Sequence, residues 1–252
     1  MNYKVALLAG LMALSVFLRF YFRYRRRTLT RKQRRVMTTY ASYYGHLDAP
    51  SKCSFERIVA DFVNDKQWQG SGITVVDEMK VMIGSCAAQL LLGFPKVRLR
   101  HFKYIRVTAG PYRSERDGRM HLGEVRPGPG VIIISWSDFV KGYADPRNAY
   151  NVGLHEFAHA LWFENTIENG EDHFLEGELL QKWNVQAHAE ISRMNEGNGR
   201  FFREYAGSNP AEFFAVAVEY FFEQPVEFKK ALPEIYGTLS ALLRQDLAAR
   251  MS

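Results

Sequence analysis

Hydrophobic residues recur with a helical period along much of the chain. One amphipathic face follows the i, i+3, i+4, i+7, i+8 spacing of a helix: Phe55, Ile58, Val59, Phe62 and Val63. A longer apolar pattern predicts a second helix over residues 77–92. Similar patterns predict further helices near 174–195, 210–223 and 232–249. The chain is therefore expected to be rich in helices.

Two segments instead have the pattern of strands. Residues 96–108 alternate apolar and basic side chains, which predicts a strand. Residues 131–136 form a continuous apolar run that predicts a buried strand, and the Gly- and Pro-rich stretch 109–130 between them is expected to be a loop. Together with the helices, this pattern predicts an α+β fold, with a small sheet beside several helices.

The N-terminal segment suggests a membrane anchor. Residues 3–22 are apolar apart from Lys4 and Arg19, and can just span a bilayer as one transmembrane helix. Eight basic residues follow within 23–35, against Lys4 alone on the other side, so the C-terminal part is expected in the cytoplasm, held at the inner membrane. The sequence thus divides into an anchor with a basic segment, 1–35, and a domain, 36–252. A cleaved signal peptide and a surface-lying helix remain alternatives.

The charge distribution argues against a nucleic-acid-binding domain. The net charge is +6, but residues 1–47 hold ten basic and no acidic residues. The remainder has 23 basic and 27 acidic residues, a net charge of −4. Because the basic character is confined to the N-terminal segment, we expect no direct nucleic-acid binding by the folded domain.

The sequence His155-Glu156-Phe157-Ala158-His159 has the pattern H-E-x-x-H. On a helix, positions i and i+4 share a face, so two imidazoles can bind one zinc ion beside a glutamate that acts as general base. So short a pattern can arise by chance. The surrounding residues favour a buried helix, however, and buried histidines and a glutamate are costly without partners.

The limits of this helix are set by turn and cap residues. Asp145-Pro146 predicts a turn, and Asn148 can cap the helix that follows.

A catalytic zinc site needs a third protein ligand, and two glutamates are candidates. Asn209 suits an N-cap and Pro210 the first position of an apolar helix that contains both Glu212 and Glu219. Glu212 is the preferred ligand, although it could simply favour the helix dipole. Glu219 is either the ligand or an acceptor for a histidine N–H.

The order of these motifs resembles the Mlc titration factor A family. These are bacterial zinc peptidases related to the catalytic domain of anthrax lethal factor. Tyr205 precedes Glu212 by the seven residues that are typical of the family, and the resemblance extends over about residues 50–230. It implies a gluzincin-like domain with one zinc ion, the ligands His155, His159 and Glu212, the general base Glu156 and the electrophilic hydroxyl Tyr205.

Two positions deserve comparison with the family pattern. An acidic residue usually follows the second histidine by three positions, where this chain has Trp162. Such a carboxylate would orient a ligand, and Glu164 or Glu219 could replace it. His121 matches a family histidine that is an additional metal ligand in a resting state, or it is a strand histidine without such a role.

Two functions are compatible with these features. The first is a zinc metallopeptidase that hydrolyses peptide bonds by a zinc-bound water, with Glu156 as base and a peptide or protein as substrate. The second is a regulatory protein that sequesters a transcription repressor or another partner with little catalysis, as the family name implies. The Glu156→Gln variant would separate the two.

Overall fold

The computed structural model describes residues 28–251 apart from four positions, and in addition Met12, Leu14 and Ser15. The four positions are Pro146, Glu171, Asp172 and Arg200. Among the described residues, no helix is both long and apolar enough to cross a bilayer. The span predicted at residues 3–22 lies outside the described part, except for the three isolated positions.

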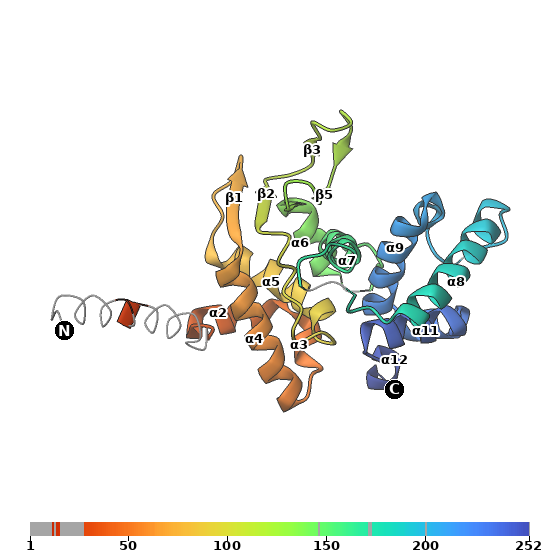
Figure 1. Cartoon of the computed structure of the whole chain (residues 1–252), viewed down its shortest axis with the longest axis horizontal. Coiled ribbons are helices and arrows are strands. Elements are labelled where there is room, and N and C mark those ends of the chain that lie inside the picture. The colour runs from red at the N-terminus through yellow and green to blue at the C-terminus, as the bar shows by residue number, and fades with distance from the viewer. Residues whose placement is uncertain are drawn as a thin grey trace, which may run out of the picture.

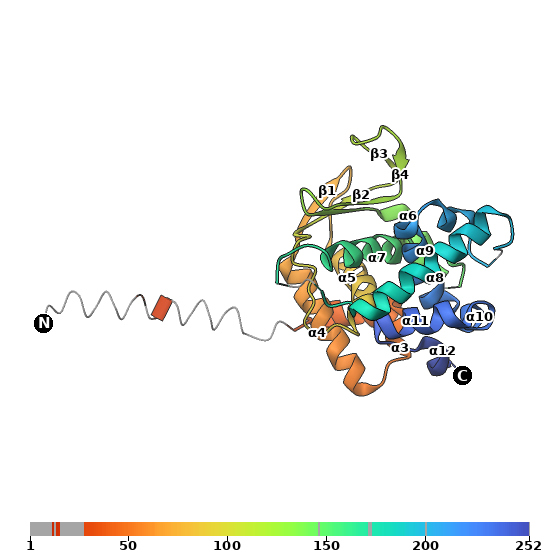
Figure 2. The ribbon, with the colours of Figure 1, turned by 45° about the vertical axis from the view of Figure 1, so that its right-hand side comes forward.

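A small mixed sheet forms the upper layer of the domain in Figures 1 and 2. The strands follow the order β1-β2-β6-β5: Gln67–Ser71, Tyr104–Thr108, Val131–Ser135 and Gly123–Arg126. The first three are parallel, and β5 is an antiparallel edge strand beside β6. A separate two-stranded hairpin, β3 (Tyr112–Arg113) and β4 (Met120–His121), projects above the sheet.

Two groups of helices lie below the sheet. The N-terminal group comprises α2 to α5: Arg31–Tyr40, Ser42–Gly45, Ala49–Asp65 and Asp77–Leu91. The C-terminal group comprises α8, the 3₁₀ helix η1, and α9 to α12: Gly177–Asn195, Glu204–Ser208, Pro210–Glu223, Pro225–Ala231, Pro233–Leu243 and Leu247–Met251. Between them run α6 (Trp136–Ala144) and α7 (Val152–Glu164), with α7 below the sheet in both views.

Helix α7 is the centre of the packing. It contacts β5 and β6 above, α5 and α6 on one side and α9 on the other. Phe157 of α7 is buried. Its ring packs edge-on against that of Phe62 from α4, with the two ring centroids 5.5 Å apart. The buried hydrophobic residues form one continuous cluster that joins both helical groups. The H-E-x-x-H helix is therefore fixed on nearly all sides by the core.

Several predicted elements are confirmed. The helices expected at 77–92 and 210–223 correspond to α5 and α9, and the strand at 131–136 corresponds to β6, with Trp136 beginning α6. The alternating residues at 96–108 form a strand only from Tyr104 onward. Before it, Leu99 has a left-handed backbone, and the Lys66 ammonium donates hydrogen bonds to the carbonyls of Arg98 and Leu99. That stretch is therefore a turn held by a side chain.

Two further predictions need correction. The segment 109–130 was expected to be a loop, but it contains β3, β4 and the edge strand β5. The helix expected at 232–249 is interrupted, because Arg244 adopts a left-handed conformation and ends α11. The chain then turns into α12.

The core begins inside the basic N-terminal segment. Leu29 is 6% exposed, and Val36 and Met37 of α2 are also buried in the main cluster. Arg34 donates two hydrogen bonds to the Glu56 carboxylate of α4. Residues 28–35 thus pack against the domain that follows them.

We expect Gly153→Ala to destabilise the domain by about 1–2 kcal/mol. A Cβ at Gly153 of α7 would lie 2.6 Å from the Phe139 ring and 2.7 Å from the Cys86 sulfur. Overpacking of this kind costs about 1–3 kcal/mol, which outweighs the roughly 1 kcal/mol gained in helix propensity.

The matched control is Gly237→Ala, because Gly237 lies inside α11 with no atom near the added Cβ. We expect it to leave stability unchanged or to raise it by up to about 1 kcal/mol. Denaturant unfolding of both variants gives the comparison. Equal stability of the two would show that the core around Gly153 adapts to the extra methyl group.

Candidate active site

Asn151 fixes the start of the helix that carries the H-E-x-x-H motif. Its Oδ1 accepts a hydrogen bond from the Leu154 amide at 3.0 Å, as an N-cap does. The cap predicted at Asn148 is therefore wrong by three residues. The reason is local: Asn148 accepts from the Tyr150 amide in a turn, and Ala149 has a positive φ of 53° that a helix cannot continue.

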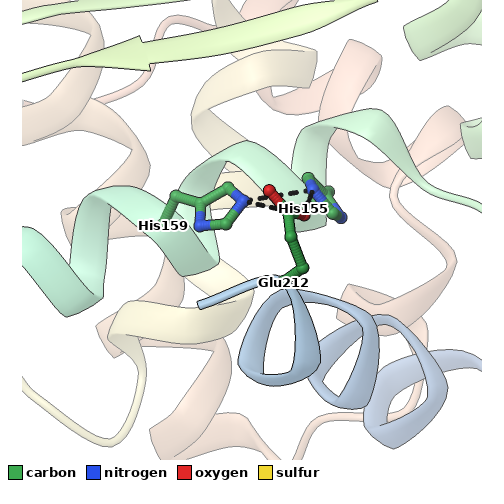
Figure 3. Close-up of side chains that lie close together, drawn as sticks. All are labelled: His155, His159 and Glu212. Atoms are coloured by element: carbon green, nitrogen blue, oxygen red, sulfur yellow. Dashed lines mark hydrogen bonds and ion pairs between the residues drawn. The ribbon is translucent and has the colours of Figure 1, made fainter. Parts of the chain in front are cut away.

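Three of the predicted site residues converge. His155 and His159 project from α7 toward Glu212 in the first turn of α9 (Figure 3). The two Nε2 atoms are 3.1 Å apart, and the Glu212 Oε2 atom lies 3.0 Å from the first and 3.4 Å from the second. Within the described part of the chain, this is the one cluster of three or more His, Cys, Asp or Glu side chains whose ligand atoms lie close enough together to hold a metal ion.

The positions of His155 Nε2, His159 Nε2 and Glu212 Oε2 suit three ligands of one metal ion better than they suit direct hydrogen bonds among these atoms. The His155 Nδ1 atom is hydrogen-bonded to Glu219, so in the neutral tautomer its Nε2 atom presents a lone pair to His159 and Glu212. Glu212 Oε2 is buried and makes no hydrogen bond of acceptable geometry with the described residues. Tetrahedral zinc ligands at about 2.0–2.1 Å from the metal are separated by roughly 3.3 Å, close to the three distances here.

The charge of the surroundings also favours a cation at this point. Burial alone would lower the pKa of His155, but the neighbouring Glu212 and Glu219 carboxylates outweigh it and raise the pKa to about 10. Burial lowers the pKa of His159. For Glu212, burial is opposed by both histidines, and the net effect is a pKa well below the usual range. The site therefore stabilises a positive charge between carboxylates.

Glu219 supports the first histidine from behind. Its Oε1 atom is 2.8 Å from His155 Nδ1, and its Oε2 atom accepts a hydrogen bond from the Asn151 amide at 2.6 Å. The Arg203 guanidinium donates to both carboxylate oxygens and to the Ala149 carbonyl. Glu219 is 1% exposed, so these contacts compensate the burial of its charge. Of the two roles open to Glu219, the geometry favours the histidine acceptor.

Glu156 lies against the edge strand β5 of the sheet. It is 6% exposed, and its carboxylate packs against Gly123 of β5. A Cβ at Gly123 would lie 2.5 Å from both Cγ and Oε1 of Glu156, so only glycine leaves room for this side chain. Burial raises the pKa of Glu156 to about 8, while the charge of His155 opposes the shift. A bound cation would lower this pKa and favour the carboxylate.

Tyr205 lies beside the first histidine of the cluster. It belongs to η1, directly before α9, and its ring centroid is 6.1 Å from that of His155. Its side chain is half exposed. Partial burial and the neighbouring Glu212 carboxylate raise the pKa of the phenol to about 12. The hydroxyl is therefore protonated at neutral pH and can donate a hydrogen bond.

The position of the missing acidic residue is filled by an aromatic contact. The Trp162 ring packs 5.0 Å from that of Phe214 in α9. Of the two proposed replacements, Glu219 contacts His155, whereas Glu164 accepts hydrogen bonds from the His101 amide and the Asn169 side chain. A carboxylate therefore orients the first histidine from α9, and position 162 supplies none for the second.

His121 is not brought to the cluster. It lies in β4 of the projecting hairpin, where its Nε2 atom is 3.0 Å from both Asp117 oxygens. His121 is absent from the group of described residues that can share a metal. In this structure it pairs with Asp117.

Three residues of the site were not found from the sequence. Gly123, Asn151 and Arg203 each act through contacts between segments far apart in the chain. Asn151 had a detectable signal, since it precedes an apolar helix as an N-cap does. Nothing in the local sequence distinguishes Gly123 or Arg203 from the residues around them.

A buried H-E-x-x-H helix below a small sheet, with a glutamate of α9 beside both histidines, is an arrangement typical of metallopeptidases. Residues 18–244 match the profile of the family described as glucose-regulated metallo-peptidase M90. The chain belongs to this family. The family implies a metal, and His155, His159 and Glu212 can hold it.

Similar proteins come from several bacteria. An uncharacterised protein of Synechocystis sp. is 25% identical over 213 residues, which cover 78% of each chain. Mlc titration factor A of Edwardsiella ictaluri is 28% identical over 167 residues, 60% of this chain and 63% of that protein. The protein of that name from Pectobacterium atrosepticum is 25% identical over 60% of this chain and 62% of its own length. The resemblance to the Mlc titration factor A family is thus confirmed.

We expect variants of the three converging residues to lose the metal. His155→Ala and Glu212→Ala each remove one of the three groups that can hold the ion and should abolish measurable metal binding. Glu219→Ala removes only the group behind His155 and should weaken metal affinity by about 10–100-fold. The measurement is metal content after dialysis, together with competition against a chelator.

The control is Glu190→Ala, because Glu190 is also a buried glutamate paired with an arginine, Arg193 at 3.1 Å, but lies on α8. It should leave metal affinity unchanged. Full metal binding by Glu212→Ala with complete loss in Glu219→Ala would transfer the ligand role to Glu219.

Proposed function

We propose that this protein is a zinc-dependent peptidase that hydrolyses peptide bonds, with one zinc ion per chain. The observation that supports this most directly is the placement of Glu156. It lies in α7 between two histidines that converge on Glu212, and Gly123 leaves space for its carboxylate. A metal site that served structure alone would not need an adjacent buried carboxylate.

Each residue has a distinct role in this proposal. His155, His159 and Glu212 hold the ion, which supplies a Lewis acid for the attacking water and the substrate carbonyl. Glu156 accepts a proton from the attacking water and delivers it to the leaving amine. Tyr205 donates a hydrogen bond to the oxygen on which negative charge develops. Glu219, held by Arg203, keeps the His155 ring in position.

The sheet suggests where a peptide substrate binds. Strand β6 lies just ahead of the H-E-x-x-H helix in the chain, but it is paired with β2 on one side and β5 on the other, so it cannot accept a further strand. Of the two edge strands, β1 and β5, it is β5 that lies at the site, because its Gly123 touches Glu156. We propose that an extended peptide adds to β5, which brings its backbone beside the general base.

A second function is favoured by the name of several relatives. Mlc titration factor A is named for the titration of Mlc, and the similar region covers 63% of that protein from Edwardsiella ictaluri. By analogy, this chain would bind a transcription regulator and sequester it. Catalysis and binding are separable, since the first needs the Glu156 carboxylate and the second needs only surface.

We expect Glu156→Gln to abolish peptide hydrolysis and to retain the metal. The amide has nearly the same shape as the carboxylate but cannot accept the proton, so a loss of about 10²–10⁴-fold or more in kcat is expected. The measurement is cleavage of a peptide library by wild type and variant, with metal content and melting temperature as controls. Undiminished hydrolysis by the variant would remove Glu156 from the mechanism and leave the binding function as the better account.

We expect Tyr205→Phe to lower kcat by about 10²–10³-fold and to change KM little. A donor to a developing oxyanion acts mainly in the transition state, so its loss affects the chemical step. The matched control is Tyr150→Phe, because Tyr150 is similarly exposed and its ring lies 5.2 Å from the Arg203 guanidinium carbon. If Tyr205→Phe is fully active, its hydroxyl has no catalytic role.

We also propose that residues 3–22 anchor the protein in the inner membrane, with the domain in the cytoplasm. The support is the charge asymmetry around this apolar segment. We expect alkaline phosphatase fused after Ser252 to be inactive. An active fusion would place the domain outside, and extraction of the full chain by carbonate alone would indicate a surface-lying helix.

A further inference from the structure

A cavity of about 460 Å³ lies at the N-terminal end of α7. It is formed where α3, α5, α6, the start of α7, the end of α9 and α12 meet. None of the three converging metal-site residues lines it. Its volume falls within the range of about 300–1,000 Å³ that is usual for small-molecule sites.

The interior of the cavity is largely apolar. Its walls include Leu47, Leu154, Phe222 and Leu247, together with the ring of Tyr43. These residues come from four different parts of the chain, and all four aliphatic and phenyl side chains belong to the main core cluster. The body of a ligand that fits here is therefore apolar.

The charged groups at the cavity are mostly basic. Arg147 and Arg250 line it, and neither guanidinium forms an ion pair with the residues that the structure describes. Arg250 donates a hydrogen bond to the Tyr43 hydroxyl at 3.3 Å. The one lining carboxylate, Glu223, is 8% exposed and accepts a hydrogen bond from Asn151 at 3.0 Å. The Oε2 atom of Glu223 is buried without a hydrogen-bond partner among the described residues, and burial raises the pKa of this carboxyl to about 7, which reduces its negative charge at neutral pH. The two arginines thus favour a negative charge on the ligand.

We propose that this cavity binds a small organic acid, with its apolar body between α7, α9 and α12 and its anionic group at Arg147 and Arg250. An arginine pair can hold a carboxylate or phosphate through charge-assisted hydrogen bonds. A neutral or cationic molecule of the same shape lacks this contribution. The site is separate from the proposed peptidase centre, and binding here does not depend on catalysis.

The cavity is nevertheless connected to the metal site through its wall. The side chain of Asn151 donates a hydrogen bond to Glu223 at 3.0 Å, and its backbone N–H donates one to Glu219 at 2.6 Å. Glu219 in turn contacts His155 at 2.8 Å. An occupant therefore touches the same residue that starts α7 and positions the carboxylate behind the first histidine.

The experiment uses a photoreactive acid and its uncharged counterpart on the full chain. The probes are 4-benzoylbenzoate and 4-benzoylbenzamide, and the labelled residues are identified by mass spectrometry. We expect saturable labelling by the acid within the segments 42–47 and 247–250, and about tenfold less labelling by the amide at equal concentration. Locating the label distinguishes the cavity from the metal centre and from the N-terminal segment.

Variants test the role of the arginines. Arg147→Gln with Arg250→Gln should reduce cavity labelling by about tenfold, since two charge-assisted contacts are lost. Arg57→Gln is the control, because Arg57 is an exposed arginine on α4 that does not line the cavity. Ser42→Trp, at an exposed position on its rim, should block labelling without touching the arginines.

Three results would overturn the proposal. Equal labelling by acid and amide would show that the anionic group is not recognised. Unchanged labelling in the double glutamine variant, with a melting temperature equal to wild type, would remove the arginines from the site. Labelling confined to other segments would show that the acid does not bind in the cavity.

Discussion

The buried Glu219 carboxylate is the contact on which the rest of the site depends. It accepts hydrogen bonds from His155, from the Asn151 amide and from Arg203, and so joins α7, α9 and the segment before η1. A buried charge needs such partners, because its desolvation is otherwise costly. The partners also set the geometry: α9 cannot slide along α7 without breaking them, and Glu212 keeps its place opposite both histidines.

Features of the fold and site could be predicted from the sequence where the residues involved lie close together along the chain. Features that depend on contacts between distant segments could not. The H-E-x-x-H spacing, the Asn209 cap and the apolar run of α9 are local patterns, and the structure brings their residues together as expected. Gly123 could not be found, because its requirement arises from Glu156 on another element. Strand β5 was missed for a related reason, since four residues beside a Gly- and Pro-rich loop carry too short a pattern.

The misplaced boundaries have the same origin. Alternation at 96–103 predicts a strand, yet Lys66 and Glu164 satisfy backbone groups there from elsewhere in the fold. Asn148 and Asn151 are both good caps by type, and only the left-handed Ala149 between them decides which one begins α7. Local preference supplies the candidates, and tertiary contacts select among them.

The two histidines differ in the groups that orient their rings. His155 has a buried carboxylate behind it, held by an arginine, while the position three residues after His159 is occupied by Trp162, which packs on Phe214. A carboxylate at position 162 would replace the contact with Phe214 and would itself have to be partly desolvated between α7 and α9. The tryptophan avoids that cost and replaces it with apolar packing between α7 and α9. Orientation of His159 then depends on Glu212 and on the packing of α7 itself.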